Sequence, residues 1–253
     1  MRKLSMALLA GVALVGCGVD TEAENQEITA NLIQAGYQAD DIKVVDGLVY
    51  VGNDAHVTLE ASREIAQSGN GHEQYSTTNL VGTSVTTICL NPTSTFNSYS
   101  RLSQGLDLAI QNYNQLGLRI NFVRGPASGC TANITAKTMS GTGGSAGFPS
   151  GGLPYGTINI GTGLQSYSVD VNEHVITHEL GHAIGFRHSD YYNRAISCGG
   201  SASNEGTAGV GANLIPGTPS TATVGGSIMN ACFRSTETGE WTSSDITALN
   251  YLY

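Results

Sequence analysis

The chain is poor in charge, and its basic residues are fewer than its acidic ones. Charged residues make up 12% of the 253, with 11 Lys and Arg against 20 Asp and Glu, which gives a formal charge of −9. A shortage of cations removes the electrostatic attraction on which nucleic-acid binding depends. We therefore expect no nucleic-acid partner, and the acidic balance favours solubility outside the cell.

Long apolar runs are also missing, apart from a short one near the N-terminus. Arg2 and Lys3 precede this run, and small residues follow it up to Cys17. That order is typical of a secretion signal, and the run is too short to span a bilayer as a helix. Leu14-Val15-Gly16-Cys17 resembles a bacterial lipobox, so we expect residues 1–16 to be a lipoprotein signal peptide and Cys17 to carry the lipid. An ordinary signal peptide cleaved nearby is the alternative.

These features predict an envelope protein. We expect a chain anchored at the bacterial cell envelope, at the outer membrane, through the lipid on Cys17 alone, or secreted after processing. Cysteine is otherwise scarce, and an even number in an exported chain predicts two disulfides. Four cysteines allow three pairings, among which we favour the sequential one because it closes two moderate loops. The four candidates are Cys89, Cys130, Cys198 and Cys232.

Hydrophobic periodicity divides the chain into a small N-terminal module and a larger domain. The module is expected to contain a helix and a two-stranded hairpin that turns at Asp46-Gly47, a dipeptide typical of tight turns. The Gly-, Asn-, Ser- and Thr-rich stretch 68–79 predicts a linker with a boundary near residue 75. The helix is expected at 23–35 and the strands at 42–45 and 48–51. We therefore expect a module with its linker at 17–75 and the main domain at 76–253.

The main domain has a mixed order of helices and strands. Apolar spacing predicts helices at 99–116, 169–185 and 241–253, the last with Ile246, Leu249 and Tyr251 turned inward. Runs of β-branched and aromatic residues predict strands at 118–123, 131–139 and 155–160. The Gly- and Ser-rich stretch 140–152 predicts a surface loop. The fold class is therefore α/β (α+β).

The most informative segment runs from His178 to His188 and reads HELGHAIGFRH. His178 and His182 are four residues apart, so on a helix both imidazoles lie on one face and can bind one Zn²⁺. Glu179 then lies beside the metal instead of on it. Gly185 can end the helix with a positive φ, and the turn brings His188 back as a third ligand. Three nitrogen ligands leave one position for water, as in catalytic zinc sites.

These residues resemble the metzincin metallopeptidases, whose pattern HExxHxxGxxH is followed by a Met-containing turn. The turn lies at 227–230, and the resemblance implies that Met229 forms an apolar floor beneath the imidazoles. Within that clan, residues 177–190 look like those of the bacterial dual-action HEIGH metallopeptidases, with Leu180 in place of the isoleucine. Three further segments add to this resemblance, at 198–200, 215–219 and 229–232.

The resemblance covers about residues 80–253. It implies a metzincin-like catalytic domain with a twisted mixed sheet, an active-site helix and a C-terminal helical subdomain. It also implies that the substrate lies along an edge strand near 155–160. We therefore predict a monomeric zinc endopeptidase that acts on extracellular proteins or peptides, with Glu179 as general base and acid. His174, one turn before His178, is interpreted as a packed or substrate-facing residue.

A secreted peptidase needs suppression until export, so the module at 17–75 is interpreted as propeptide-like. Asp54 loosely resembles the aspartate switch of astacin-type zymogens, in which a carboxylate takes the open zinc position. A plain turn residue is the alternative for Asp54. Two other functions stay open: a surface-anchored binding lipoprotein with a metalloprotease-like domain, and a zinc amidase that acts on cell-wall peptides.

Overall fold

The computed structural model describes residues 21–35, 37–67, 75–205, 212–219 and 221–253. The predicted signal peptide, Cys17 and residues 68–74 of the predicted linker lie outside the described residues. Within the described ranges, no helix combines the length and the apolar character needed to cross a bilayer.

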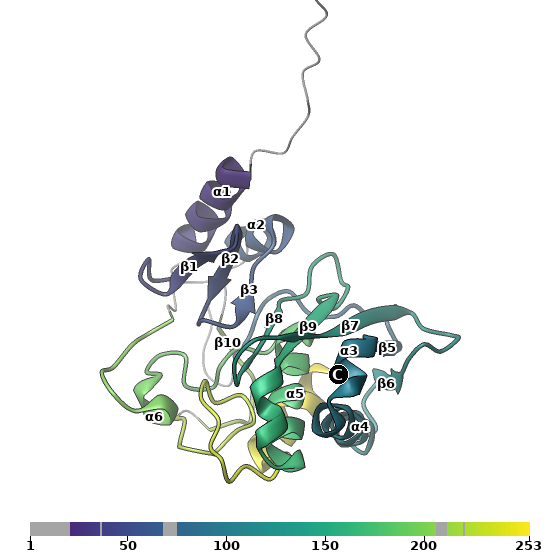
Figure 1. Cartoon of the computed structure of the whole chain (residues 1–253). Helices are drawn as coiled ribbons and strands as arrows, with labels where there is room; N and C mark the ends of the chain where they lie inside the picture. Colours follow the sequence, from purple (N-terminus) through teal and green to yellow (C-terminus); the bar gives the residue numbers. More distant parts are fainter. Residues whose placement is uncertain (1–20, 36, 68–74, 206–211, 220) are drawn as a thin grey trace, which may run out of the picture.

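The N-terminal module, here residues 21–67, folds as two helices on a small sheet (Figure 1). The predicted helix and hairpin are confirmed, with Asp46 at φ 51° and Gly47 at φ 77° in the turn. A third strand and a second helix were not predicted. The elements are α1 (Thr21–Gln34), β1 (Ile42–Val45), β2 (Leu48–Val51), β3 (Ala55–His56) and α2 (Leu59–Gln67).

The main domain contains five further strands of the same mixed sheet, whose order is β1-β2-β3-β8-β9-β7-β5-β6. Strands β5, β6, β7 and β9 run parallel, and β8 is antiparallel to β9. The module continues the sheet, because β3 pairs with β8 in a parallel register. The bounds are β5 (Thr87–Pro92), β6 (Asn121–Arg124), β7 (Ala132–Met139), β8 (Gly144–Gly147) and β9 (Thr157–Gly161). The predicted mixed α/β fold is confirmed.

Two long helices lie side by side on one face of this sheet (Figure 1). They are α4 (Ser100–Asn114) and α5 (Val169–Ile184), and α5 is buried along almost its whole length. The remaining elements are α3 (Ser94–Ser98), the 3₁₀ helix at Thr162–Ser166, α6 (Ala195–Cys198), α7 (Ser243–Leu252) and the two-stranded pair β4 (Tyr75–Ser76) with β10 (Asn213–Leu214). The helix at the C-terminus is confirmed, but Tyr251 is 60% exposed and Ala248 is buried in its place.

Two predictions about the sheet are wrong. The stretch 140–152, expected as a surface loop, contains β8, and its Ala146 and Phe148 are buried. Its residues are small because α5 packs against it: a Cβ on Gly144 would lie 2.3 Å from Oε1 of Glu179. The strand expected at an edge near 155–160 is internal, since β9 lies between β8 and β7. Among the strands of the main domain in this sheet, β8 and β6 therefore lie at the two edges.

The end of the predicted linker also differs from expectation. Tyr75, Ser76 and Thr77 are buried, and β4 pairs with β10, whereas a linker would be exposed to solvent.

The disulfides join Cys89 to Cys130 and Cys198 to Cys232, which is the sequential pairing. The second disulfide ties α6 to the segment that follows the Met-containing turn.

Candidate metal centre

Helix α5 positions three of the predicted site residues. Ser168 caps its N-terminus by accepting a hydrogen bond from the backbone N–H of Val171. Gly185 ends it with φ 115°, as the sequence predicted, and a Cβ there would also lie 2.8 Å from the carbonyl oxygen of Asn79. The chain can turn back at this point because glycine tolerates both the conformation and the close approach.

The three histidines bring their Nε2 atoms together. Nε2 of His188 lies 3.2 Å from Nε2 of His178 and 3.2 Å from Nε2 of His182. Each Nδ1 faces an oxygen: the Ile228 carbonyl for His178 and the Phe186 carbonyl for His182, both at 2.8 Å, and Oε1 of Glu205 for His188 at 2.6 Å. Carbonyl and carboxylate oxygens accept, so each Nδ1 carries a proton, and in the neutral ring each Nε2 presents a lone pair.

Three lone pairs that face one another at this distance repel unless a cation lies between them. Tetrahedral zinc with Zn–N bonds of about 2.0–2.1 Å separates its nitrogen ligands by about 3.3 Å, close to the spacing found. Burial lowers the pKa of His178 to about 4 and lowers the pKa of His182 as well, which favours the neutral, metal-binding form. The residues present therefore fit a zinc ion.

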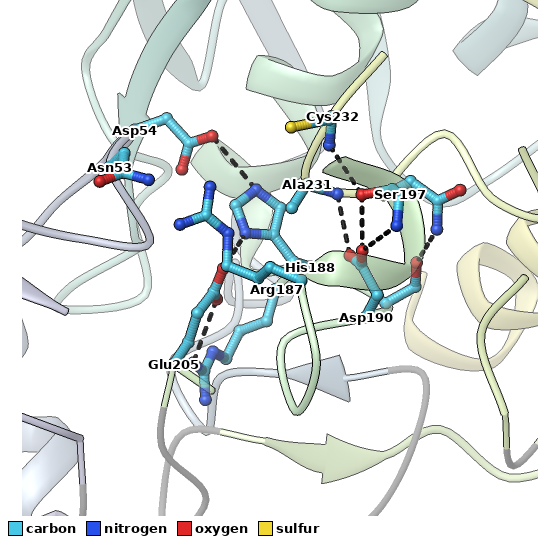
Figure 2. Close-up of polar contacts among 12 residues, drawn as sticks. Asn53, Asp54, Arg187, His188, Asp190, Ser197, Glu205, Ala231 and Cys232 are labelled. Carbon is cyan, nitrogen blue, oxygen red and sulfur yellow. Dashed lines mark hydrogen bonds and ion pairs between the residues drawn. The ribbon is translucent and has the colours of Figure 1, made fainter. Parts of the chain in front are cut away.

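Asp54 adds an oxygen to this group. Asp54 lies in the turn before β3 and points toward His188 (Figure 2), with its Oδ2 3.2 Å from Nε2 of that residue. Its carboxylate oxygens lie 3.9–4.0 Å from the other two histidines. All four ligand atoms lie within 4.8 Å of one another. Burial by itself raises the pKa of Asp54, but the three histidines together outweigh it and lower that pKa. Asp54 is therefore a carboxylate that faces the point where the imidazoles converge.

Glu179 lies beside this group without a partner for one of its oxygens. Among the described residues, Oε2 of Glu179 is buried and makes no hydrogen bond. Burial, together with the negative charge of Asp54, raises the pKa of Glu179. The side chain lines a cavity of about 310 Å³, whose walls are formed by Asn53, Asp54, Thr142, Gly143, Gly144, His174, Val175, His178, Glu179, Arg194, Asn230, Ala231, Cys232 and Phe233. A carboxylate placed in this way can exchange a proton with a molecule in the cavity.

The Met-containing turn packs against α5. A Cβ on Gly181 would lie 2.5 Å from Sδ of Met229, so a glycine lets the sulfur approach the helix backbone. Asp245 of α7 holds this turn by accepting hydrogen bonds from the Ser227 hydroxyl and the Ile228 backbone N–H. Met229 itself is 2% exposed.

Two carboxylates support the site from outside. Asp190 is fully buried and accepts hydrogen bonds from Ser197 and from the backbone N–H of Ala231 (Figure 2). Glu205 orients His188 and was not found from the sequence. It lies 17 residues away in a loop without a motif, and its ion pairs with Arg187 and Arg194 are tertiary contacts that spacing does not reveal.

The sequence places this site in a known family. A profile of the dual-action HEIGH metallopeptidases matches residues 49–253. The chain belongs to this family. It is therefore a zinc metallopeptidase, its cofactor is zinc, and its substrates are proteins or peptides.

Two solved structures match this chain at low sequence identity. High choriolytic enzyme 1, a hatching enzyme zinc-protease of the medaka Oryzias latipes, is 16% identical; the match covers 69% of this chain and 92% of that chain, with a TM-score of 0.38. Myroilysin is 16% identical, covers 75% of this chain and 92% of its own, and has a TM-score of 0.41. The sequence comparison with curated proteins gave no match.

Proposed function

We propose that this HEIGH metallopeptidase is an endopeptidase of extracellular proteins, with His178, His182 and His188 as zinc ligands and Glu179 as general base and acid. The observation that carries the proposal is the buried, unpartnered Oε2 of Glu179 in a cavity beside three converging Nε2 atoms. A structural zinc site would not need such a carboxylate, because its four ligands would close the coordination shell.

The chemistry divides between the metal and the side chains. Zinc, when bound, acts as a Lewis acid that lowers the pKa of a bound water and polarises the scissile carbonyl. Oε2 of Glu179 takes the proton of the attacking water and then donates it to the amine that leaves. Glu205 and the Ile228 and Phe186 carbonyls hold the imidazoles in the tautomer that leaves Nε2 free for the ion.

Strand β8 offers a place for an extended peptide. In the uncleaved chain, the outer edge of β8 is paired with β3 of the module. The backbone N–H of Ala146 also donates to the carbonyl oxygen of Asp54 at 3.1 Å. Without the module, β8 would present unpaired backbone groups next to Glu179, and a substrate can add to such an edge as a further strand. This assignment replaces the expected edge near 155–160.

We further propose that the chain is made as a latent precursor. The carboxylate of Asp54 lies where a three-nitrogen site leaves room for water, 3.2 Å from Nε2 of His188. Removal of the module by cleavage in or after residues 68–74 would withdraw Asp54 and uncover β8 together. The N-terminal sequence up to Cys17 supports export and lipid attachment at the bacterial envelope, which mass spectrometry of the exported protein would test.

The function is tested with the processed, exported protein. We expect it to hydrolyse casein, to lose this activity in 1,10-phenanthroline and to regain it when zinc is added back. Release of peptides from isolated cell wall, with casein untouched, would identify the amidase instead. A zinc-loaded protein that cleaves neither substrate would support the binding lipoprotein.

A further inference from the structure

A second titratable side chain lines the cavity and has no role in the mechanism above. His174 lies on α5, one turn before His178, and is 3% exposed. Neither of its ring nitrogens makes a hydrogen bond among the described residues. Buried polar groups in folded proteins nearly always have a partner, so an unpartnered imidazole in the wall of a cavity indicates a missing contact with something that enters it.

The position of His174 decides which part of a substrate it would meet. In the proposed mechanism Glu179 donates its proton to the leaving amine, so the residue that supplies this amine lies on the side of Glu179. Val175 and His174 line the same cavity further along α5, together with residues 230–233. The cavity therefore receives the side chain of the residue that follows the scissile bond.

The proton on His174 is placed by a neighbouring carboxylate. Oε2 of Glu237 lies 3.8 Å from Nδ1 of His174, too far for a hydrogen bond but close enough to favour a proton on that nitrogen. Arg234 holds Glu237 through two contacts of 2.8 and 3.0 Å, which keeps it a carboxylate. Nε2 is then the ring nitrogen left for a group in the cavity, and it is an acceptor.

We propose that His174 makes this cavity select, after the scissile bond, a neutral side chain that ends in an N–H or O–H donor. The proposal rests on the endopeptidase function proposed above. An acidic side chain would meet the carboxylate of Glu179, because Arg194 in the same lining is already paired with Glu205. A cation would have to give up its water beside an imidazole that carries no charge. Burial lowers the pKa of His174 to about 4, so the ring is neutral at the pH of the cell surroundings.

The test uses peptides that differ only in the residue after the scissile bond, in two matched pairs: Gln with Met, and Tyr with Phe. The processed enzyme should cleave the donor-bearing member of at least one pair about tenfold faster, measured as kcat/KM, the effect of one hydrogen bond. His174→Leu should reduce that ratio to about one while zinc content stays stoichiometric. His174→Gln should keep part of the preference, whereas Val175→Ala should change the size preference and leave the donor preference intact.

A binding measurement separates this proposal from the proposed function. Peptide hydroxamates with Gln or Met at the same position should bind the zinc-loaded protein with about tenfold different affinity by calorimetry, and His174→Leu should abolish the difference. If the Gln and Met hydroxamates bind with different affinities but no peptide is cleaved, the endopeptidase function is refuted and the binding preference of the cavity stands. Cleavage without a donor preference in either pair, or a preference that survives His174→Leu, would refute the role of His174.

Discussion

The two sides of the metal centre are held in different ways. The histidines and Glu179 belong to a part with a large common core, which α4, α5 and the sheet share, and which two disulfides cross-link. Asp54 belongs to the N-terminal module, which has a separate, smaller core, and residues 21–67 contain no cysteine. The groups proposed to act throughout catalysis thus belong to the larger, cross-linked core, and the group proposed to leave belongs to the smaller one.

The largest effect is expected on the fixed side. Glu179→Gln in the processed enzyme should lower the rate of casein hydrolysis by about 10²–10⁴-fold, because it removes the proton acceptor. Zinc content, measured by atomic absorption, should stay at one ion per chain. Glu173→Gln is the matched control: this buried glutamate of α5 contacts Asn112, away from the cavity, and should retain activity. Full activity in the Glu179 variant would contradict the mechanism.

On the removable side, Asp54→Ala in the uncleaved precursor should raise hydrolysis of a small quenched peptide. We expect an increase in the rate of about 100-fold, because the Asp54 carboxylate no longer competes with water and substrate for the zinc ion. This factor corresponds to about 2.7 kcal/mol. Asp40→Ala changes an exposed carboxylate of the same module and should leave the precursor latent. If the Asp54 variant were as inactive as the precursor, coverage of β8 by the module would be the cause of latency instead.

Glu205 lies where the two sides of the metal centre meet. It bonds Nδ1 of His188, and the module covers it closely, since a Cβ on Gly52 would lie 2.9 Å from its Oε1. Glu205→Gln keeps an acceptor but removes the charge, and Glu205→Ala removes both. Support of this kind is worth about 10–100-fold in metal affinity, so we expect losses up to that size, larger for alanine, in a competition titration with a zinc chelator. Unchanged affinity in both variants would show that His188 needs no such support.

The features that the sequence predicted well are local ones. The spacing of His178, His182 and His188 and the glycine at 185 depend on helix periodicity and local backbone conformation, which short segments encode. The hairpin at Asp46-Gly47 was predicted for the same reason. Contacts between distant segments were not accessible in this way, and Glu205 is the clearest example, because no pattern links it to His188.

Strand β8 shows a second limit. Its glycines, serine and alanine have the composition of a loop, but they are small because α5 and the module approach from both sides. Composition alone cannot distinguish flexible backbone from backbone that another element touches closely. The edge strand was consequently assigned to β9, and the position of Asp54 against the histidines could not be deduced from its turn.

The smallest effect is expected at Phe148, a side chain of the catalytic part that packs into the core of the module. Phe148 follows β8 in the catalytic part but packs in the core of the module, with its ring centroid 5.9 Å from that of His182. Phe148→Leu should loosen the module by about 1 kcal/mol, since it removes packing without opening a large cavity. Opening should therefore be about fivefold more frequent, which hydrogen exchange in β2 and β3 would measure. Phe122→Leu, a change of the same kind within the main core, should lower overall stability without this local effect. Equal hydrogen exchange in both variants would mean that Phe148 does not hold the module in place.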